Sequence, residues 1–162
     1  MKKEEIFFRN ARISDALAIS KLIKRNLVGA KINKYTLEQV RGIAQKNTVK
    51  EIRERIKKFK VFCALEKGKL IGTVYFGEVY PKENNIGGLY IDPAFLYLGV
   101  GKKLLHLVEK YARKKKVRRI DLYALNYSKD FYLRNGYKIN KVYMWKVGKA
   151  KTRTYGMEKN LK

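Results

Sequence analysis

The stretch LYIDPAFLYLGVGKKLL, residues 89–105, contains the turn on which the interpretation of this chain depends. Its first residues are apolar and typical of a strand, and Asp92-Pro93 ends that strand because proline cannot donate to a neighbouring strand. The apolar residues after Gly99 recur at helical spacing. The stretch therefore predicts a strand, a connection with glycines at 99 and 101, and an amphipathic helix that begins at Gly99.

This arrangement suits the binding of an anion. The N–H groups in the first turn of a helix have no intrahelical partner, and the helix dipole is positive there, so phosphates bind readily. Gly99 and Gly101 lack the Cβ atoms that would hold a pyrophosphate away, and Lys102 and Lys103 add positive charge. By itself, a glycine pair before a helix more often serves only close packing.

Two other phosphate-binding motifs are excluded by the sequence. The P-loop requires GxxxxGK followed by Ser or Thr, and no such string occurs. The Rossmann fingerprint requires a third glycine at position 104, where this chain has Leu104, and it normally lies in the first strand–helix unit.

Toward the N-terminus the pattern predicts a strand, three helices and a hairpin. Residues 6–13 are expected to form the strand, and Ser14 is a candidate cap for the first helix. Thr36 and Thr48 are candidate caps for the next two helices, because each is followed three positions later by Gln or Glu. The β-branched and aromatic segments 61–66 and 69–80, separated by Lys67-Gly68, predict the hairpin.

Toward the C-terminus strands and helices alternate. The expected elements are a strand at 118–125, a short helix at 128–136, and strands at 137–147 and 153–161. Together with a strand at 86–91, the order is strand, helices, three strands, helix, strand, helix, two strands. This order predicts a mixed α/β domain.

Length and composition indicate one domain. A chain of 162 residues with 46% hydrophobic content can bury a single core, so we expect one domain over residues 1–162. No apolar run approaches the roughly 18 to 20 residues of a membrane span, and the first residues lack the apolar stretch of a secretory signal. Cys63 is the only cysteine, which excludes an internal disulfide and a four-thiolate zinc site. We expect a cytoplasmic protein without a metal.

The charge balance is strongly basic. The chain has 39 Lys and Arg residues against 14 Asp and Glu, a formal net charge of +25. Such a surface attracts polyanions, whether nucleic acid, a phosphate-rich cofactor or an acidic partner. The lysines are spread from end to end, so a general surface property without a specific partner is an equally weighted interpretation.

A second motif lies downstream of the glycine turn, where Asn126 follows a predicted strand and FYLRNGY follows at 131–137. Together with LYIDP at 89–93, LYLGVG at 96–101 and the closing GMEKNL, these segments resemble the GNAT superfamily of N-acetyltransferases. The resemblance implies a mixed, mostly antiparallel central sheet of about seven strands flanked by four or five helices. One departure is Leu96, where the family usually has Gln or Arg, and Tyr97 stands where Gly or a basic residue is frequent.

The resemblance also implies acetyl-CoA as cosubstrate and a set of residues that contact it. The implied contacts are Leu89, Tyr90, Ile91, Tyr97, Leu98, Gly99, Val100, Gly101, Lys102, Lys103 and Asn126. An outward N–H of the strand, such as that of Ile91, would stabilise the oxyanion. Asn126 would bind the pantetheine amide, although Asn is also a frequent helix cap at such a place. Tyr132 is the candidate general acid, since the pKa of a phenol lies near that of a thiol.

The general base is harder to identify. Asp121, five residues before Asn126, is the first candidate, and it shares a strand face with Tyr123. A salt bridge with a neighbouring arginine is an equally weighted role for it. The further candidates are Glu78, Glu83 and a chain of water molecules. For the acceptor pocket the candidates are Tyr35, Tyr143 and Trp145.

The prediction is therefore an N-acetyltransferase in which an amine attacks acetyl-CoA directly. The acceptor would be a small molecule, a protein N-terminus or a lysine, and the protein a monomer or homodimer without a membrane partner. One alternative is a nucleic-acid-binding module on the same fold, with the basic residues of 110–119 as its footprint. Another is a non-catalytic coenzyme A sensor.

Overall fold

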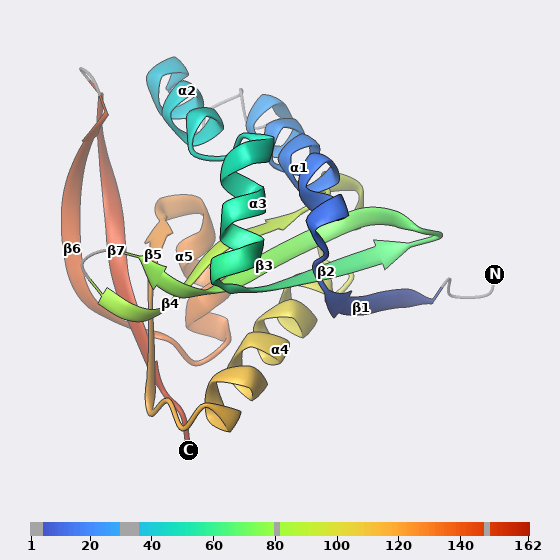
Figure 1. Ribbon diagram of the computed structural model, residues 1–162. Coiled ribbons are helices and arrows are strands. Elements are labelled where there is room, and N and C mark those ends of the chain that lie inside the picture. Colours follow the sequence, from blue (N-terminus) through green and yellow to red (C-terminus); the bar gives the residue numbers. More distant parts are fainter. Residues whose placement is uncertain (1–4, 30–35, 80–81, 148–149) are drawn as a thin grey trace.

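A seven-stranded mixed sheet in the order β1-β2-β3-β4-β5-β7-β6 forms the centre of the molecule (Figure 1). The computed structural model describes residues 5–29, 36–79, 82–147 and 150–162. The strands are β1 Ile6–Asn10, β2 Lys60–Glu66, β3 Lys69–Val79, β4 Lys82–Ile91, β5 Arg119–Leu125, β6 Lys138–Val147 and β7 Ala150–Asn160. β4 and β5 are parallel and the other neighbours are antiparallel, as the resemblance implies.

Within the described ranges, five α-helices flank the sheet. They are α1 Ala16–Gly29, α2 Leu37–Gln45, α3 Val49–Lys58, α4 Val100–Lys114 and α5 Asn126–Arg134. A 3-10 turn, Pro93–Phe95, follows β4, and Asp92 caps it by accepting from the Ala94 N–H at 3.1 Å. No α-helix among the described residues combines the length and the apolarity that crossing a membrane requires. The mixed α/β fold with seven strands is confirmed.

Capping residues explain where two helices begin. Thr36 accepts from the Gln39 N–H at 3.2 Å while the Gln39 side chain accepts from the Thr36 N–H at 2.7 Å, so the expected capping box of α2 is present. At α3, Thr48 accepts from the Glu51 N–H at 3.3 Å, which is one half of such a box. Both predicted helix starts are confirmed.

The first strand and helix differ from the prediction. β1 ends at Asn10, and a 3-10 turn, Ile13–Asp15, precedes α1. Asp15, not Ser14, organises this turn, because its carboxylate accepts from the Arg12 N–H at 2.6 Å and from Arg9 at 2.7 Å. A carboxylate binds a guanidinium and an amide together more strongly than a serine hydroxyl can.

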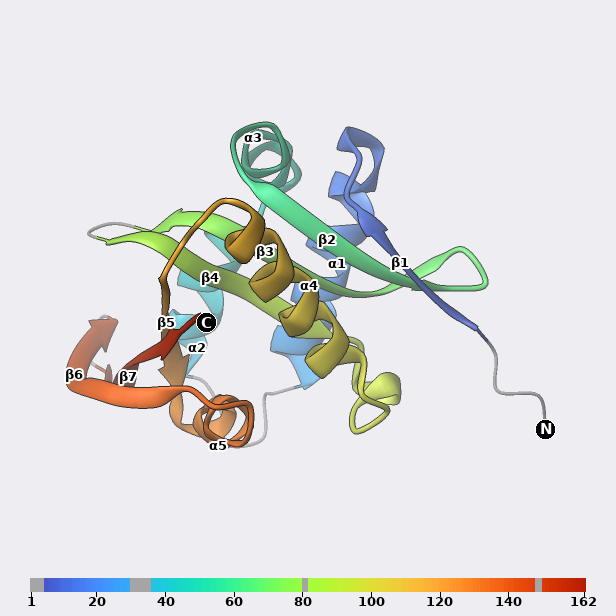
Figure 2. The ribbon, with the colours of Figure 1, turned by 90° about the horizontal axis from the view of Figure 1, so that it is seen from below.

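Two apolar cores lie on opposite faces of the sheet (Figure 2). On one face α4 packs against the sheet, and β5 contributes alternate residues. The contacting side chains there are Val100, Leu104, Leu105, Val108, Ala112, Ile120, Leu122 and Ala124. On the other face α1 and α3 pack against Val61, Cys63 and Leu70. The alternation along β5 therefore places Asp121 and Tyr123 on the α1–α3 face.

Candidate active site

The sheet parts between its two parallel strands. β4 and β5 pair at two register positions, Asn85 with Asp121 and Ile86 with Leu122. β4 nevertheless continues to Ile91 beside β3, and β5 continues to Leu125 beside β7. In Figure 1, β1 to β4 cross the view whereas β5, β6 and β7 stand nearly upright at its left. Within the described chain no strand fills the gap between β4 and β5, and an extended molecule can add to such open edges.

A β-bulge bends β4 at the start of the gap. Thr73 pairs with Tyr90 whereas Tyr75 pairs with Gly87, so β4 contains one residue more than β3 over this interval. Gly88 has φ +58°, a conformation that favours glycine. A bulge bends its strand and increases its twist, which directs β4 away from β5. The Gly87-Gly88 pair is a known signal for a bulge, and the sequence interpretation did not use it.

Tyr75 holds the bulge from the α1–α3 face. A Cβ added to Gly87 would overlap the Tyr75 ring, so this ring lies directly against the glycine backbone. Arg55 of α3 lies 4.7 Å from the ring centroid, and its Nη1 donates to Asn47 Oδ1 at 2.8 Å. A cavity of about 10 Å³ borders Arg55, Tyr75 and Gly88. These contacts connect the helical layer to the bulge, and sequence reasoning named none of them.

The hydrogen bonds of β4 orient its N–H groups. The Asp92 N–H donates to the Ile71 carbonyl of β3 at 2.7 Å. Since successive N–H groups of a strand point to opposite sides, the N–H of Ile91, and again that of Leu89, point into the gap. Leu89 and Ile91 pack their side chains on the α4 face, whereas Tyr90 packs on the α1–α3 face. The strand thus offers donors to the gap.

The start of α4 lies beside this gap. Gly99 is the N-cap with φ +81°, and the Lys103 N–H donates to the Gly99 carbonyl at 3.0 Å. The amides of residues 100–102 therefore precede the first intrahelical bond and are available to an anion. Lys102 and Lys103 are exposed. Tyr97, at φ +64°, is 99% exposed, and Leu98 is also exposed.

Gly99 and Gly101 differ in what a side chain at each position would contact. A Cβ on Gly99 would meet nothing within 4 Å, so that glycine is required by its backbone conformation alone. A Cβ on Gly101 would lie 3.5 Å from the Phe131 ring of α5 and 3.7 Å from Ile91 of β4. Gly101 therefore faces the space between β4 and α5. The sequence interpretation gave both glycines one reason, and the structure separates them.

Asn126 is the first residue of α5. Its Oδ1 accepts a hydrogen bond from Tyr155 Oη at 3.3 Å, and Lys129 lies 5.1 Å from the centroid of the Tyr155 ring. This contact uses the acceptor of the amide and leaves the Nδ2 donor for another partner. The residue at the N-cap position is Leu125, so Asn126 is not the cap.

Tyr132 of α5 is buried, 8% exposed, on the α4 face of the sheet. Its ring makes edge contacts with Phe131 at 5.1 Å and with Tyr137 at 5.7 Å. Burial, with smaller contributions from Tyr127 and Tyr90, raises the pKa of Tyr132. Burial likewise raises the pKa of Tyr90 to about 12. Both phenols are therefore protonated at neutral pH and can donate a proton.

Asp121 lies where the gap closes. It is buried at the last paired positions of β4 and β5, and the Arg119 Nε lies 3.4 Å from its carboxylate. The salt bridge that we weighed against a catalytic role is thus present, and its role as a base stays a prediction. Tyr35 lies outside the described residues, as do the side chains of Glu78, Glu83 and Trp145. Tyr143 lies 5.8 Å from Tyr123, ring to ring.

Most predicted site residues surround one gap. β4 supplies residues 89–91, the start of α4 supplies residues 97–103, and α5 supplies Asn126 and Tyr132. Asp121 lies at its closed end. Among the described residues no group of three or more His, Cys, Asp and Glu side chains could hold a metal ion. The arrangement can hold a phosphate-bearing, extended molecule between two strands and present a proton donor to it.

The chain resembles known proteins in sequence and in fold. Residues 33–137 match the model of the acetyltransferase (GNAT) family. No curated protein matches the chain. A similar solved structure is a GCN5-related N-acetyltransferase from Rhodopseudomonas palustris, with a TM-score of 0.82 at 18% identity over 99% of each chain.

Two other similar structures contain the cofactor. PaiA N-acetyltransferase from Thermoplasma acidophilum, in complex with coenzyme A, has a TM-score of 0.79 at 21% identity, covering 96% of this chain and 99% of that one. YncA from Salmonella typhimurium, with acetyl-CoA, has a TM-score of 0.75 at 16% identity, covering 98% and 95%. These identities show a shared fold, and the family model matches well over half of the chain. The protein therefore belongs to the GNAT family of acetyltransferases.

Proposed function

We propose that this protein is an acetyl-CoA-dependent N-acetyltransferase that moves the acetyl group to a primary amine by direct attack. The observation that carries the proposal is the parting of β4 and β5 beside the start of α4. Family membership supports it, as do the complexes of PaiA with coenzyme A and of YncA with acetyl-CoA.

The gap and the helix start would share the binding of the cosubstrate. The amides of Val100, Gly101 and Lys102 would hold the pyrophosphate, since they converge at the positive end of the α4 dipole. The inward N–H groups of Leu89 and Ile91 would pair with the extended pantetheine arm and the acetyl carbonyl. Pyrophosphate binding would not require the Gln or Arg side chain that the family usually has in place of Leu96, because the backbone amides of α4 make the contacts.

The chemistry would need no covalent acyl-enzyme. The amine nitrogen attacks the thioester carbonyl, the C–N bond forms, and the C–S bond breaks as the oxyanion collapses. The Ile91 N–H would stabilise that oxyanion, and Tyr132 would protonate the departing sulfur. Asp121 or water would take the proton that the amine loses. Holding both reactants in one gap supplies the remaining acceleration.

The acceptor would enter from the α1–α3 face. Tyr132 and α4 lie on the opposite face, whereas Asp121 and Tyr123 are on the α1–α3 side. Tyr143 adds a second ring beside Tyr123. A small amine, a protein N-terminus or a lysine side chain would each fit the reaction.

The test is thiol release from acetyl-CoA against a panel of small amines, peptides and polyamines. Cys63, the only cysteine, is fully buried, so the native protein adds little thiol background. We expect Tyr132→Phe to lower turnover by about 100-fold or more while coenzyme A binding by calorimetry stays near wild type. Tyr111→Phe, a tyrosine in an edge contact with Phe76, is the matched control.

Two outcomes contradict the proposal in different ways. Tight coenzyme A binding with no thiol release for any amine would indicate a non-catalytic binding protein. No heat on titration of folded protein with coenzyme A would remove the cofactor site itself.

A further inference from the structure

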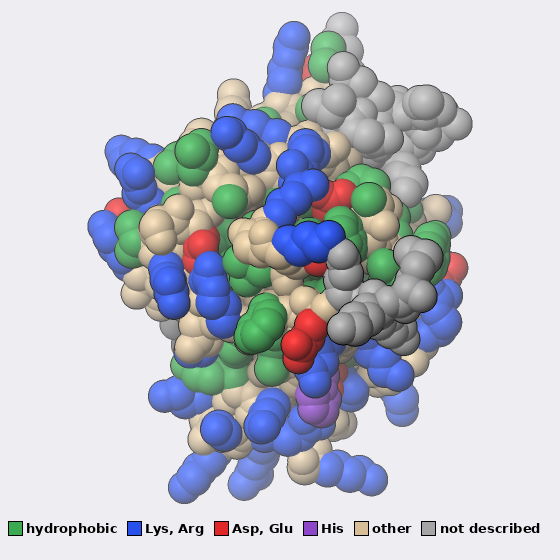
Figure 3. Space-filling model, turned by 90° about the vertical axis from the view of Figure 1, so that its right-hand side faces the viewer, with side chains coloured by type: hydrophobic (Ala, Val, Ile, Leu, Met, Phe, Trp, Pro, Cys, Tyr) green, Lys and Arg blue, Asp and Glu red, His purple; other side chains and the backbone are tan. Residues whose placement is uncertain are grey.

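One end of α4 carries an unusual concentration of positive charge. The residues are Lys110, Arg113, Lys114, Lys115, Lys116, Arg118 and Arg119, which we call the basic cluster. All seven are exposed, and the segment 110–119 contains no acidic residue. Figure 3 shows Lys and Arg side chains gathered in the lower part of the molecule, around and below the single histidine. The cluster therefore presents seven exposed cations within ten consecutive residues, with no acidic residue between them in the sequence.

Most of the basic cluster is not neutralised within the described part of the chain. Arg119 approaches Asp121 at 3.4 Å, and Arg113 approaches Glu109 at 3.8 Å. Glu109 is itself buried and already accepts from Lys159 at 2.8 Å. Within the described residues, no carboxylate lies within 4 Å of the remaining five cations, Lys110, Lys114, Lys115, Lys116 and Arg118.

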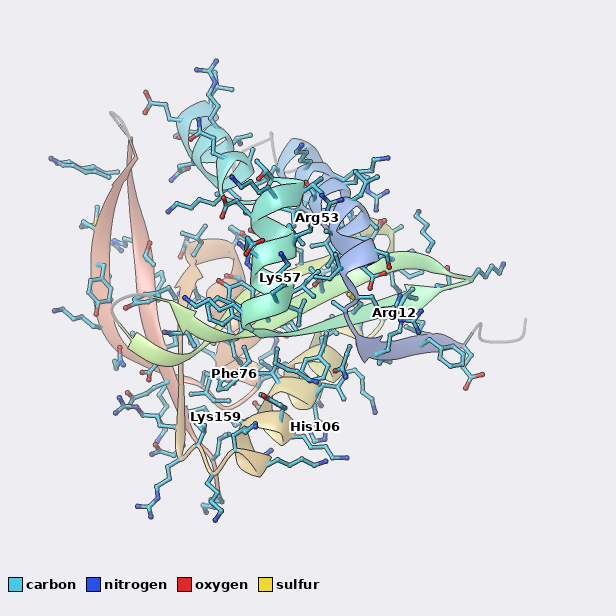
Figure 4. All side chains as sticks on the ribbon, in the orientation of Figure 1. Arg12, Arg53, Lys57, Phe76, His106 and Lys159 are labelled. Atoms are coloured by element: carbon cyan, nitrogen blue, oxygen red, sulfur yellow. The ribbon has the colours of Figure 1, made fainter. Side chains whose placement is uncertain are left out.

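Helix α3, on the other face of the sheet, is a useful contrast. It also carries several basic residues, yet Glu51 and Glu54 lie among them, and Lys57 pairs with Glu54 at 2.9 Å. Figure 4 shows Arg53 and Lys57 on α3 above the sheet and His106 on α4 below it. If the positive charge were only a general property of the surface, acidic residues would be expected among the basic ones in both α3 and the basic cluster.

Lys116 occupies a position that glycine would fill with less strain. Its φ is +59°, and the following N–H, of Val117, donates to the Ala112 carbonyl at 3.0 Å, as at many helix ends that use glycine. For a residue with a Cβ this conformation costs about 1 to 2 kcal/mol. The helix dipole favours cations in the last turn of α4, but it does not explain a lysine at this strained position.

The surroundings of the cluster indicate the chemistry of a partner. From residue 99 to 120 no large apolar side chain is exposed, and the Tyr111 ring contacts Phe62 and Phe76 and has the ammonium groups of Lys60 and of Lys115, a member of the cluster, over its face. Single-stranded nucleic acids need exposed aromatic rings for stacking, and membrane attachment is favoured by apolar anchors. A duplex backbone needs only cations along a line, at about one phosphate per 1.7 Å of axis.

We propose that the basic cluster binds the phosphate backbone of double-stranded nucleic acid without reading its sequence. The cluster lies at the opposite end of α4 from Gly99, about 22 Å away for a helix of this length. Acetyl-CoA and a duplex would therefore bind at the same time. This second activity does not depend on the proposed acetyltransferase reaction.

The first measurement is the salt dependence of binding by the full chain to labelled duplexes of one sequence, as DNA and as RNA. If the five cations without a carboxylate partner among the described residues each neutralise a phosphate, affinity falls roughly 500-fold between about 50 and about 200 mM salt. The matching single strand is expected to bind at least about tenfold more weakly, since residues 99–120 around the cluster expose no large apolar or aromatic side chain for stacking. Equal or tighter single-strand binding would overturn the duplex assignment.

The decisive comparison is between two triple variants that remove the same number of charges from different surfaces. Lys110→Gln, Lys114→Gln and Arg118→Gln together remove three charges from the cluster, and Lys50→Gln, Arg53→Gln and Lys57→Gln remove three from α3. We expect the first triple variant to bind a duplex at least about 30-fold more weakly at low salt, with the salt slope reduced by about three. The second should change affinity by no more than about twofold. Equal losses in both would show that net charge, not this surface, attracts the duplex.

Lys116→Gly separates binding from stability. Glycine relieves the strained conformation, so the melting temperature is expected to stay or rise while duplex affinity falls severalfold. Unchanged duplex affinity would show that Lys116 does not contact the duplex and would count against the basic cluster as the binding site.

Competition completes the test. Saturating coenzyme A should leave duplex affinity unchanged, and displacement would place the duplex at the cofactor loop, which contradicts the proposal. Polyglutamate or anionic lipid vesicles that compete as well as the duplex would show a general polyanion surface and would also overturn it.

Discussion

The two edges of β4 behave differently. On one side β4 pairs with β3 from Lys82 to Ile91, across two shifts of register, and the sheet is continuous. On the other side it pairs with β5 at Asn85 and Ile86 and then separates. The same strand thus contributes to a closed junction and to an open one. What differs is the partner: β5 is held by β7 along its whole length and cannot follow β4 as it bends.

The comparison shows that the candidate site is made by a mismatch of strand directions. A bulge at Gly88 turns β4, and Tyr75 and Arg55 hold that turn from the α1–α3 face. The gap therefore forms without any break in the pairing of β4 with β3 or of β5 with β7. The gap arises because β1 to β4 and β5 to β7 are each well paired but run in different directions where they meet. Substitutions where β4 and β5 pair should therefore change stability, and substitutions at the gap should change ligand binding.

Ile86→Ala should have the largest effect on stability, because Ile86 is buried where β4 still pairs with β5, at the closed end of the gap. Large-to-small changes of this kind cost about 2 to 5 kcal/mol. Denaturant unfolding measures it, and coenzyme A affinity of the folded variant is expected to stay within about threefold. A variant that unfolds normally but no longer binds coenzyme A would mean that the closed end of the gap also belongs to the site.

Gly101→Leu should have the largest effect on binding. Its side chain would enter the space between Ile91 and Phe131, so we expect coenzyme A affinity to fall about 100-fold, close to 3 kcal/mol. Gly101→Ala is the control, since its Cβ makes ordinary contacts and the extra methyl is small. Calorimetry on both variants, with circular dichroism to check folding, decides the point. If the leucine variant binds normally, the ligand does not pass between these two residues.

Gly88→Ala tests the bulge. Its positive φ and its closeness to the Tyr75 ring should together lower the free energy of unfolding by about 2 to 3 kcal/mol. Gly68→Ala shares the positive φ but meets nothing within 4 Å, so about 1 to 2 kcal/mol is expected there. The difference between the two isolates the contact with Tyr75. Equal losses would show that Tyr75 does not hold the bulge.

Tyr155→Phe is a smaller change at the open junction. It removes the hydroxyl that donates to Asn126 Oδ1, a contact worth about 0.5 to 1.5 kcal/mol. The side-chain amide of Asn126 then loses its orientation, and we expect coenzyme A affinity to fall about threefold with turnover at saturation unchanged. A drop in turnover without a change in affinity would contradict a positioning role.

Cys63 lies on β2, which is paired on both sides with β1 and β3. Of the changes considered, the ionisation of its thiol has the smallest expected effect on stability at neutral pH. Burial raises the pKa of its thiol to about 12, so the thiol should stay protonated and resist a disulfide reagent until the protein unfolds. A raised pKa favours the protonated thiol in the folded state. Its stabilising contribution is therefore complete below about pH 9 and is lost as the pH rises toward 12. Rapid labelling of native protein at pH 8 would contradict this.

Much of the fold was predictable because its signals are local. Gly99 was expected to start α4, Thr36 to cap α2, and Lys67-Gly68 to join β2 and β3, and each depends on a few neighbouring residues. Ser14 was wrong as a cap because Asp15 finds a partner, Arg9, on the preceding strand. A side chain several residues away decided that case.

The candidate site was predictable in its residues more than in its geometry. The glycine turn and the family motif identified residues 97–103, Asn126 and Tyr132. Nothing in those motifs pointed to Tyr75 or Arg55, because their importance comes from contact with Gly87 and Gly88 on another strand. The Tyr155 contact with Asn126 likewise joins residues 29 positions apart.

The sequence by itself determined the helix start with its free amides, the hairpin and the order of elements, since these depend on backbone preferences within a few residues. It also determined a strongly basic chain. Only the tertiary structure decided that β4 leaves β5 after two paired positions, that Gly101 faces the resulting gap, and that five cations of the 110–119 segment have no carboxylate within 4 Å among the described residues. Those properties depend on distances between segments far apart in the chain, and hydrophobic packing around both faces of the sheet sets such distances.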